Sequence, residues 1–226
     1  MDSNAFSGTG QPAPLAAAIP VVATQRPPHG LVEALYWRLA TDWRRLALAN
    51  LMGLVSAPVA TIVFGALAVT TTGFDPLHFI GPRWTDGAAG HAEPISVVWL
   101  IAAVLGTMVI HELTHGVAIQ WCGNRPSYGF QLLGLVPYAT AEGQYFTRNQ
   151  FILCALAPLV GLSLLGSLLL PLSPTWLVPW LVLGLIANAA GAVGDVWMSL
   201  IALRYPWSAW ILDERDGMRV FVTADS

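Results

Sequence analysis

Four long apolar stretches dominate the pattern of hydrophobic and polar positions along this chain. A helix of about 20 residues crosses the roughly 30 Å hydrocarbon core of a bilayer, and each stretch is long enough to do so. We therefore predict an all-α membrane protein with about four transmembrane helices. The predicted spans cover residues 46–72, 95–122, 149–172 and 176–203.

The segments around these spans carry weaker patterns. Residues 1–30 are rich in Ala, Pro and Gly, which predicts a disordered N-terminal arm. In 31–45, apolar residues recur at helical spacing, as at Leu31 and Leu35, with charged residues between them. That spacing predicts either an amphipathic juxtamembrane helix on the inner surface or a simple extension of the first span.

Two short segments are expected to form strands. Residues 128–138, between spans two and three, are apolar but interrupted by Gly and Pro, which is typical of a strand or hairpin with 141–146 as its return limb. In the cytosolic tail, 204–226, Asp216-Gly217 separates two apolar runs and predicts a short hairpin. The first hairpin is either a plain structural loop or an edge that holds an extended substrate.

Composition supports the membrane assignment. The chain is 55% hydrophobic and only 10% charged, whereas soluble domains carry about 25% charged residues. The lipid bilayer is therefore an expected partner, and a net charge of -3 gives no reason to expect nucleic acid. Cys122 and Cys154 are too far apart in sequence for a metal-binding spacing and predict no disulfide framework.

The distribution of arginine predicts the orientation. The chain has ten basic residues, all of them Arg, and only Arg83 lies in the loop between the first two spans. If the N-terminus is cytoplasmic, the other nine Arg residues all lie on the cytoplasmic side. Because positive residues accumulate in cytoplasmic loops, we expect a multi-pass protein with both termini in the cytoplasm.

The second predicted span contains the sequence His111-Glu112-Leu113-Thr114-His115. Residues four apart lie on one face of a helix, so the two histidines can bind one zinc ion. Glu112 then lies beside a zinc-activated water and can act as the general base. Ionisable groups at membrane depth are costly, by about 2.5–3.5 kcal/mol for a charged side chain, and usually functional.

A catalytic zinc ion usually takes three protein ligands. Asp195 is the expected third ligand, because it lies in span four at about the same depth as His115 in span two. Asn188 lies one or two turns deeper and is expected either to bind substrate or a ligand residue, or to connect helices by hydrogen bonds. Glu142, in the loop after span two, remains the alternative third ligand.

Two resemblances follow from these residues. His111, Glu112, His115 and Asp195 match the zinc-binding pattern of site-2-protease-type intramembrane metalloproteases, although the usual Asp-Gly context after prolines is replaced by Gly194-Asp195-Val196. Over about 95–222 the chain also resembles a zincin-peptidase family of bacterial membrane proteins. That likeness rests on the HELTHG and Gly-Asp elements, the passage 146–158 and the tail 213–222.

These resemblances imply the function and the location that we expect. The region 46–203 would be a transmembrane metalloprotease-like domain in the bacterial cytoplasmic (inner) membrane. The expected activity is that of a zinc metalloendopeptidase, with a membrane-embedded or membrane-associated polypeptide as substrate. The alternatives are a metal transporter or sensor, and a catalytically inactive zinc-stabilised scaffold. The oligomeric state is left open.

Overall fold

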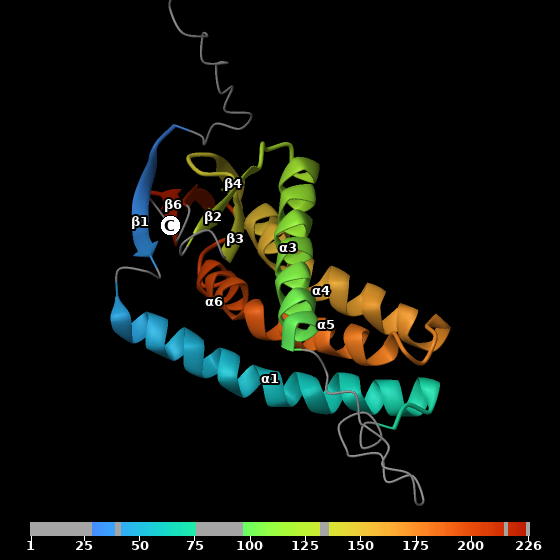
Figure 1. The fold of residues 1–226 in the computed structure, drawn as a ribbon. Helices are drawn as coiled ribbons and strands as arrows, with labels where there is room; N and C mark the ends of the chain where they lie inside the picture. Colours follow the sequence, from blue (N-terminus) through green and yellow to red (C-terminus); the bar gives the residue numbers. More distant parts are fainter. Residues whose placement is uncertain (1–28, 39–41, 76–96, 132–135, 215–216, 225–226) are drawn as a thin grey trace, which may run out of the picture.

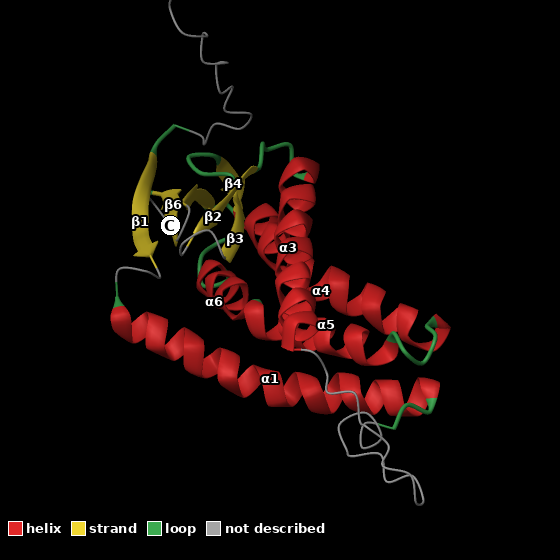
Figure 2. Ribbon diagram, in the orientation of Figure 1, coloured by secondary structure: helices red, strands yellow, loops and turns green. Residues whose placement is uncertain are grey.

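The computed structural model describes residues 29–38, 42–75, 97–131, 136–214 and 217–224 (Figure 1). The helices form one part of the molecule and the strands gather near one end of them (Figure 2). Residues 1–28 of the predicted arm 1–30 and most of the loop after the first span lie outside the described residues. The helices are α1 (Trp43–Thr72), α3 (Val97–Trp121), α4 (Arg148–Leu169), η1 (Leu170–Leu172), α5 (Val178–Gly191) and α6 (Val193–Ala202).

Among the described residues, three helices are long and apolar enough to cross a membrane. They are α1, α3 and α4 with its short extension η1, and the bent pair α5–α6 makes up to four. Their positions agree with the four predicted apolar stretches to within a few residues. Large apolar side chains on them face outward, such as Leu54 and Ile62, which are 71% and 72% exposed. Such surfaces are compatible with a lipid environment.

The fourth predicted span is not one continuous helix. It breaks at Ala192, and α5 and α6 meet there at an angle of 42°. The break places Asp195 in the first turn of α6. The α3 helix runs across α4 and α5 in Figure 1 and contacts both of them. The helices therefore do not form the simple parallel bundle that equal spans would suggest.

The strands are more extensive than the two predicted hairpins. A four-stranded antiparallel sheet has the order β1-β6-β5-β4, and β2 pairs with β3 in a separate two-stranded sheet. The all-α fold class must therefore be corrected to a mostly helical protein with a small antiparallel sheet. The strands are β1 (Leu31–Arg38), β2 (Ser127–Gln131), β3 (Val136–Thr140), β4 (Tyr145–Thr147), β5 (Trp210–Glu214) and β6 (Gly217–Thr223).

The juxtamembrane helix predicted for 31–45 is wrong for its first part. Leu31–Arg38 is a strand that pairs with β6, and helix α1 begins only at Trp43, where Asp42 caps its first turn. A spacing of four positions suits a helix, but it is also an even number and therefore places residues on one face of a strand. In β1 a register shift between Glu33 and Leu35 interrupts this alternation, so the spacing of Leu31 and Leu35 identifies neither element, and pairing with the distant β6 strand decides between them.

The loop after α3 also differs from the prediction in which residues form the strands. The return limb of its hairpin is β3, residues 136–140, and not 141–146. Residues 145–147 instead form β4, which pairs with β5. The predicted tail hairpin is present as β5 and β6. The main core lies where this sheet meets the helices, and it buries Phe146, Ile211, Met218 and Val220 almost completely.

Candidate metal centre

Three potential metal ligands meet where α3 lies against α6. His111 and His115 lie one turn apart on α3, and Asp195 comes from the first turn of α6. The Oδ2 atom of Asp195 lies 3.2 Å from Nε2 of His111 and 3.5 Å from Nε2 of His115. The three ligand atoms all lie within 4.8 Å of one another. Both histidines are at least nine-tenths buried.

These separations fit a tetrahedral zinc ion. Zinc bonds to imidazole nitrogen and carboxylate oxygen are about 2.0–2.2 Å long, so neighbouring ligand atoms of a tetrahedral site lie about 3.4 Å apart. The two measured distances between Asp195 and the histidines bracket that value. Two imidazoles and one carboxylate are also a donor set that catalytic zinc uses, with a fourth position left for water.

Asn188 on α5 orients His111. Its side-chain oxygen accepts a hydrogen bond from Nδ1 of His111 at 2.8 Å, and its amide nitrogen donates to the carbonyl of Pro158 at 3.2 Å. The second bond fixes which end of the amide faces the histidine. A proton on Nδ1 leaves Nε2 free to bind a metal, as is usual for histidine ligands. Asn188 thus contacts a potential ligand residue and also connects α5 to α3 and α4, so it fits both of its predicted roles.

A backbone carbonyl orients His115. Its Nδ1 donates to the carbonyl oxygen of Cys154 on α4 at 2.9 Å. In a regular helix that carbonyl would accept the N–H four residues later, but residue 158 is proline and has none. Pro158 therefore leaves the Cys154 carbonyl free for the histidine. The sequence reasoning missed this pair, although a proline inside a span always frees the carbonyl four residues before it.

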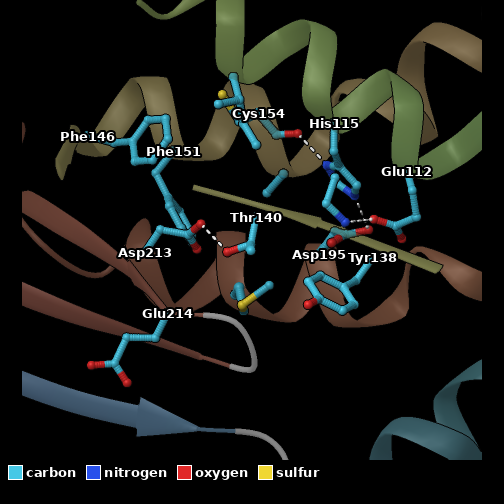
Figure 3. Close-up of a pocket in the computed structure, with 14 residues that line it drawn as sticks. Glu112, His115, Tyr138, Thr140, Phe146, Phe151, Cys154, Asp195, Asp213 and Glu214 are labelled. Carbon is cyan, nitrogen blue, oxygen red and sulfur yellow. Dashed lines mark hydrogen bonds and ion pairs between the residues drawn. The ribbon is translucent and has the colours of Figure 1, made fainter. Parts of the chain in front are cut away.

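Glu112 projects beside the three ligands and towards the β2–β3 hairpin. Its Oε2 accepts a hydrogen bond from the backbone N–H of Ala139 in β3 at 2.7 Å. Figure 3 shows its carboxylate close to Asp195 and His115, with Tyr138 nearby. The strand β3 thus lies next to the candidate general base, on the edge that is not paired with β2.

A cavity of about 180 Å³ extends from these residues towards the four-stranded sheet. Glu112, His115 and Asp195 line one part of it, and Asp213 and Glu214 of β5 line another (Figure 3). The walls between them are largely apolar. They include Ile119, Phe146, Phe151, Ala155 and Met198.

Asp213 is a second enclosed carboxylate in this cavity. Its Oδ2 accepts hydrogen bonds from the Thr140 hydroxyl at 2.8 Å and from the Ala141 N–H at 2.6 Å. Burial raises the pKa of Asp213 to about 6, because desolvation of the charged form outweighs these two hydrogen bonds. The side chain thereby ties β5 to the turn that follows β3.

Two glycines allow the elements around the site to pack closely. A side chain at Gly116, directly after His115, would overlap the ring of Tyr128 from β2. A Cβ atom at Gly191 would lie 3.1 Å from Met108 on α3. A Cβ atom at Gly194, three residues further along, would meet nothing within 4 Å. Close packing thus requires glycine at position 191 but not at position 194.

The structure brings together four of the six predicted site residues, His111, Glu112, His115 and Asp195, and it places Asn188 directly behind His111. Glu142 does not join them. It lies exposed in the turn between β3 and β4, outside the described group that could hold a metal. His78 and His91 lie outside the described residues.

Comparison with known proteins supports a zincin-like family for this region. The sequence model of a family described as "Putative zincin peptidase" matches residues 104–210, which include the three potential ligands and Glu112. The match suggests a metallopeptidase that uses zinc. No curated protein and no solved structure matches the chain.

Proposed function

We propose that this chain is an intramembrane zinc metallopeptidase that hydrolyses peptide bonds of membrane-associated polypeptides. One observation carries the proposal. Nε2 of His111, Nε2 of His115 and a carboxylate oxygen of Asp195 converge at the spacing of tetrahedral zinc ligands, with Glu112 beside them. The zincin family match and the apolar helices support it independently.

The residues divide the chemistry between them. His111, His115 and Asp195 would hold the ion, which when bound lowers the pKa of a water ligand towards about 7 and polarises the substrate carbonyl. Glu112 accepts the proton of the attacking water on its carboxylate and then gives it to the departing amine. Asn188 and the Cys154 carbonyl keep both histidines in the tautomer that offers Nε2.

The strand β3 offers a place for an extended substrate. One edge of β3 pairs with β2, while the N–H of Ala139 on the other edge points to Glu112. A peptide must be extended for hydrolysis, and an unpaired strand edge holds extended peptides through main-chain hydrogen bonds. A substrate strand on this edge would place its scissile carbonyl beside the general base.

The distribution of charge supports a cytoplasmic position for the sheet and for both termini. The starts of α1 and α4 and the ends of α3 and α6 lie near the strands in Figure 1. Arg44 and Arg148 lie at these two starts, and Arg125 and Arg204 follow these two ends. By the positive-inside rule the end of the helices near the strands faces the cytoplasm. The resemblance to bacterial membrane proteins supports the cytoplasmic membrane as its proposed location.

The test compares cells that express the wild type, Glu112→Gln or Glu142→Gln at equal levels. Mass spectrometry of new protein N-termini in the membrane fraction detects cleavage even when the substrate is unidentified. We expect termini that appear with the wild type and with the exposed-site control Glu142→Gln but not with Glu112→Gln. Identical termini with Glu112→Gln and the wild type would contradict the mechanism.

A further inference from the structure

A second cavity lies on the outside of the helices, away from the metal centre. It is a groove of about 800 Å³ that follows α4 and is bordered by the C-terminal half of α3. Its walls are almost entirely apolar and include Val117, Leu153 and Val160, each at least half exposed. The polar residues that line it lie at the end of α4 that is nearest to the sheet, at Arg148 and Asn149, apart from Thr114 on α3.

The groove has the length of one leaflet of a bilayer. It extends along α4 from Arg148 to Gly161, which are 13 residues or about 20 Å apart on a helix. Half of a bilayer, including its headgroup region, is about 20–22 Å thick. Trp121 and Trp207 line the same end as Arg148 and are 86% and 77% exposed. Exposed tryptophans are typical of the membrane–water interface.

Arg148 is a buried charge that contacts neutral groups. It is only 6% exposed. Its guanidinium donates to the side-chain oxygen of Asn149 and to the carbonyl of Tyr205, and it lies 4.5 Å from the ring centroid of Trp207. Among the described residues no carboxylate forms an ion pair with it. Buried charges are normally paired, so an anion beside Arg148 would be stabilised.

We propose that this groove binds an anionic phospholipid, with an acyl chain along α4 and the phosphate at Arg148. Three of the five guanidinium N–H groups are used by the protein, which leaves donors for phosphate oxygens. A transmembrane helix as occupant would continue through both leaflets, whereas the groove ends at Gly161. The proposal rests on the membrane placement and is independent of peptidase activity.

Native mass spectrometry of the purified full chain provides the test. The protein is equilibrated in micelles that contain equal amounts of phosphatidylglycerol and phosphatidylcholine, and the retained lipids are counted. We expect the wild type to retain phosphatidylglycerol about tenfold over phosphatidylcholine, because charge-assisted hydrogen bonds are strong. Arg148→Gln should reduce this ratio to about one. Equal retention of phosphatidylglycerol and phosphatidylcholine by the wild type would overturn the proposal.

A second pair of variants tests the groove without touching the charge. A Cβ atom at Gly161 meets nothing within 4 Å, so Gly161→Leu fills the groove without a clash. Gly106→Leu on α3 is the matched control, because that glycine is also open and does not line the groove. We expect about tenfold less retained phosphatidylglycerol for Gly161→Leu and no change for Gly106→Leu.

Other occupants would give different results. If Gly161→Leu retained as much lipid as the wild type, the lipid would not occupy the groove, which would then be covered by another part of the chain. If Gly161→Leu changed the oligomeric mass instead, the groove would be covered by a second copy. If soluble glycerol phosphate displaced the bound phosphatidylglycerol completely, the acyl chain would contribute nothing. Each of these results would overturn the proposal.

Discussion

At the scale of single residues, the proline within α4 helps to define the orientation of a metal ligand. Pro158 removes one helical N–H, and His115 takes the carbonyl of Cys154 that this leaves free. On the other side of the site, Asn188 bonds His111 and the carbonyl of Pro158 itself. The same turn of α4 thus supports both histidines. Residues that orient metal ligands typically change affinity by 10–100-fold when lost.

Pro158→Ala should therefore weaken zinc binding. The backbone N–H that alanine introduces at this position would bond the Cys154 carbonyl and compete with His115 for it. We expect about a tenfold higher zinc dissociation constant, measured by competition with a chromophoric chelator. Pro58→Ala on α1 is the matched control, because that proline is also inside a span but does not line the metal centre. Equal affinity of Pro158→Ala and Pro58→Ala would contradict this account.

Gly116 is the second residue whose size matters. A methyl group there would overlap the ring of Tyr128, so either the ring or the two elements α3 and β2 would have to shift. We expect Gly116→Ala to lower the free energy of unfolding by about 1–3 kcal/mol, the usual cost of overpacking. Gly106→Ala, in the same helix with open space around it, should have a much smaller effect or stabilise the helix. The measurement is the midpoint of unfolding in mixed micelles with increasing SDS.

At the scale of elements, Asp213 connects the two sheets around the cavity. Its carboxylate in β5 accepts hydrogen bonds from Thr140 of β3 and from Ala141 directly after it. Backbone hydrogen bonds join the same segments, from the N–H of Gly143 to the carbonyl of Asp213 and from the N–H of Asp213 to the carbonyl of Gln144. The strand next to Glu112 is therefore held in place by the tail of the chain.

This contact makes stability depend on pH. Burial raises the pKa of Asp213 to about 6, above the roughly 3.9 of an unfolded Asp. The stabilisation from this group is present below about pH 4 and is lost as the pH rises through 6, because the unfolded chain releases its proton first. This difference of about two pKa units between the folded and unfolded chain corresponds to at most about 3 kcal/mol of the free energy of unfolding.

Asp213→Asn should remove this pH dependence while keeping an oxygen that accepts the same hydrogen bonds. We expect its free energy of unfolding, relative to the wild type, to rise between pH 4 and pH 7 by up to about 3 kcal/mol. Glu142→Gln, on the neighbouring exposed turn, is the control: its charge is the smallest contribution to the raised pKa of Asp213, so it should follow the wild type closely. A constant difference between Asp213→Asn and the wild type across this range would contradict the raised pKa.

At the scale of the whole molecule, the sequence predicted the helices and the polar centre better than it predicted the sheet. Long apolar runs and the H-E-x-x-H spacing are local signals, so α1, α3 and the pair His111–His115 follow from them directly. The pairing of β1 with β6 joins residues at opposite ends of the chain, and a local pattern contains no information about such a partner. The break at Ala192 lies between Gly191 and Gly194, but isolated glycines are tolerated inside helices and do not by themselves predict a break.

The central claim is a zinc centre made by His111, His115 and Asp195, and metal analysis of purified protein tests it most directly. The wild type should contain about one zinc per chain, and the Glu142→Ala control should contain the same amount. His111→Ala and Asp195→Ala should each lose most of the metal while they keep the helical content of the wild type by circular dichroism. Full zinc occupancy in a folded Asp195→Ala variant would contradict the account.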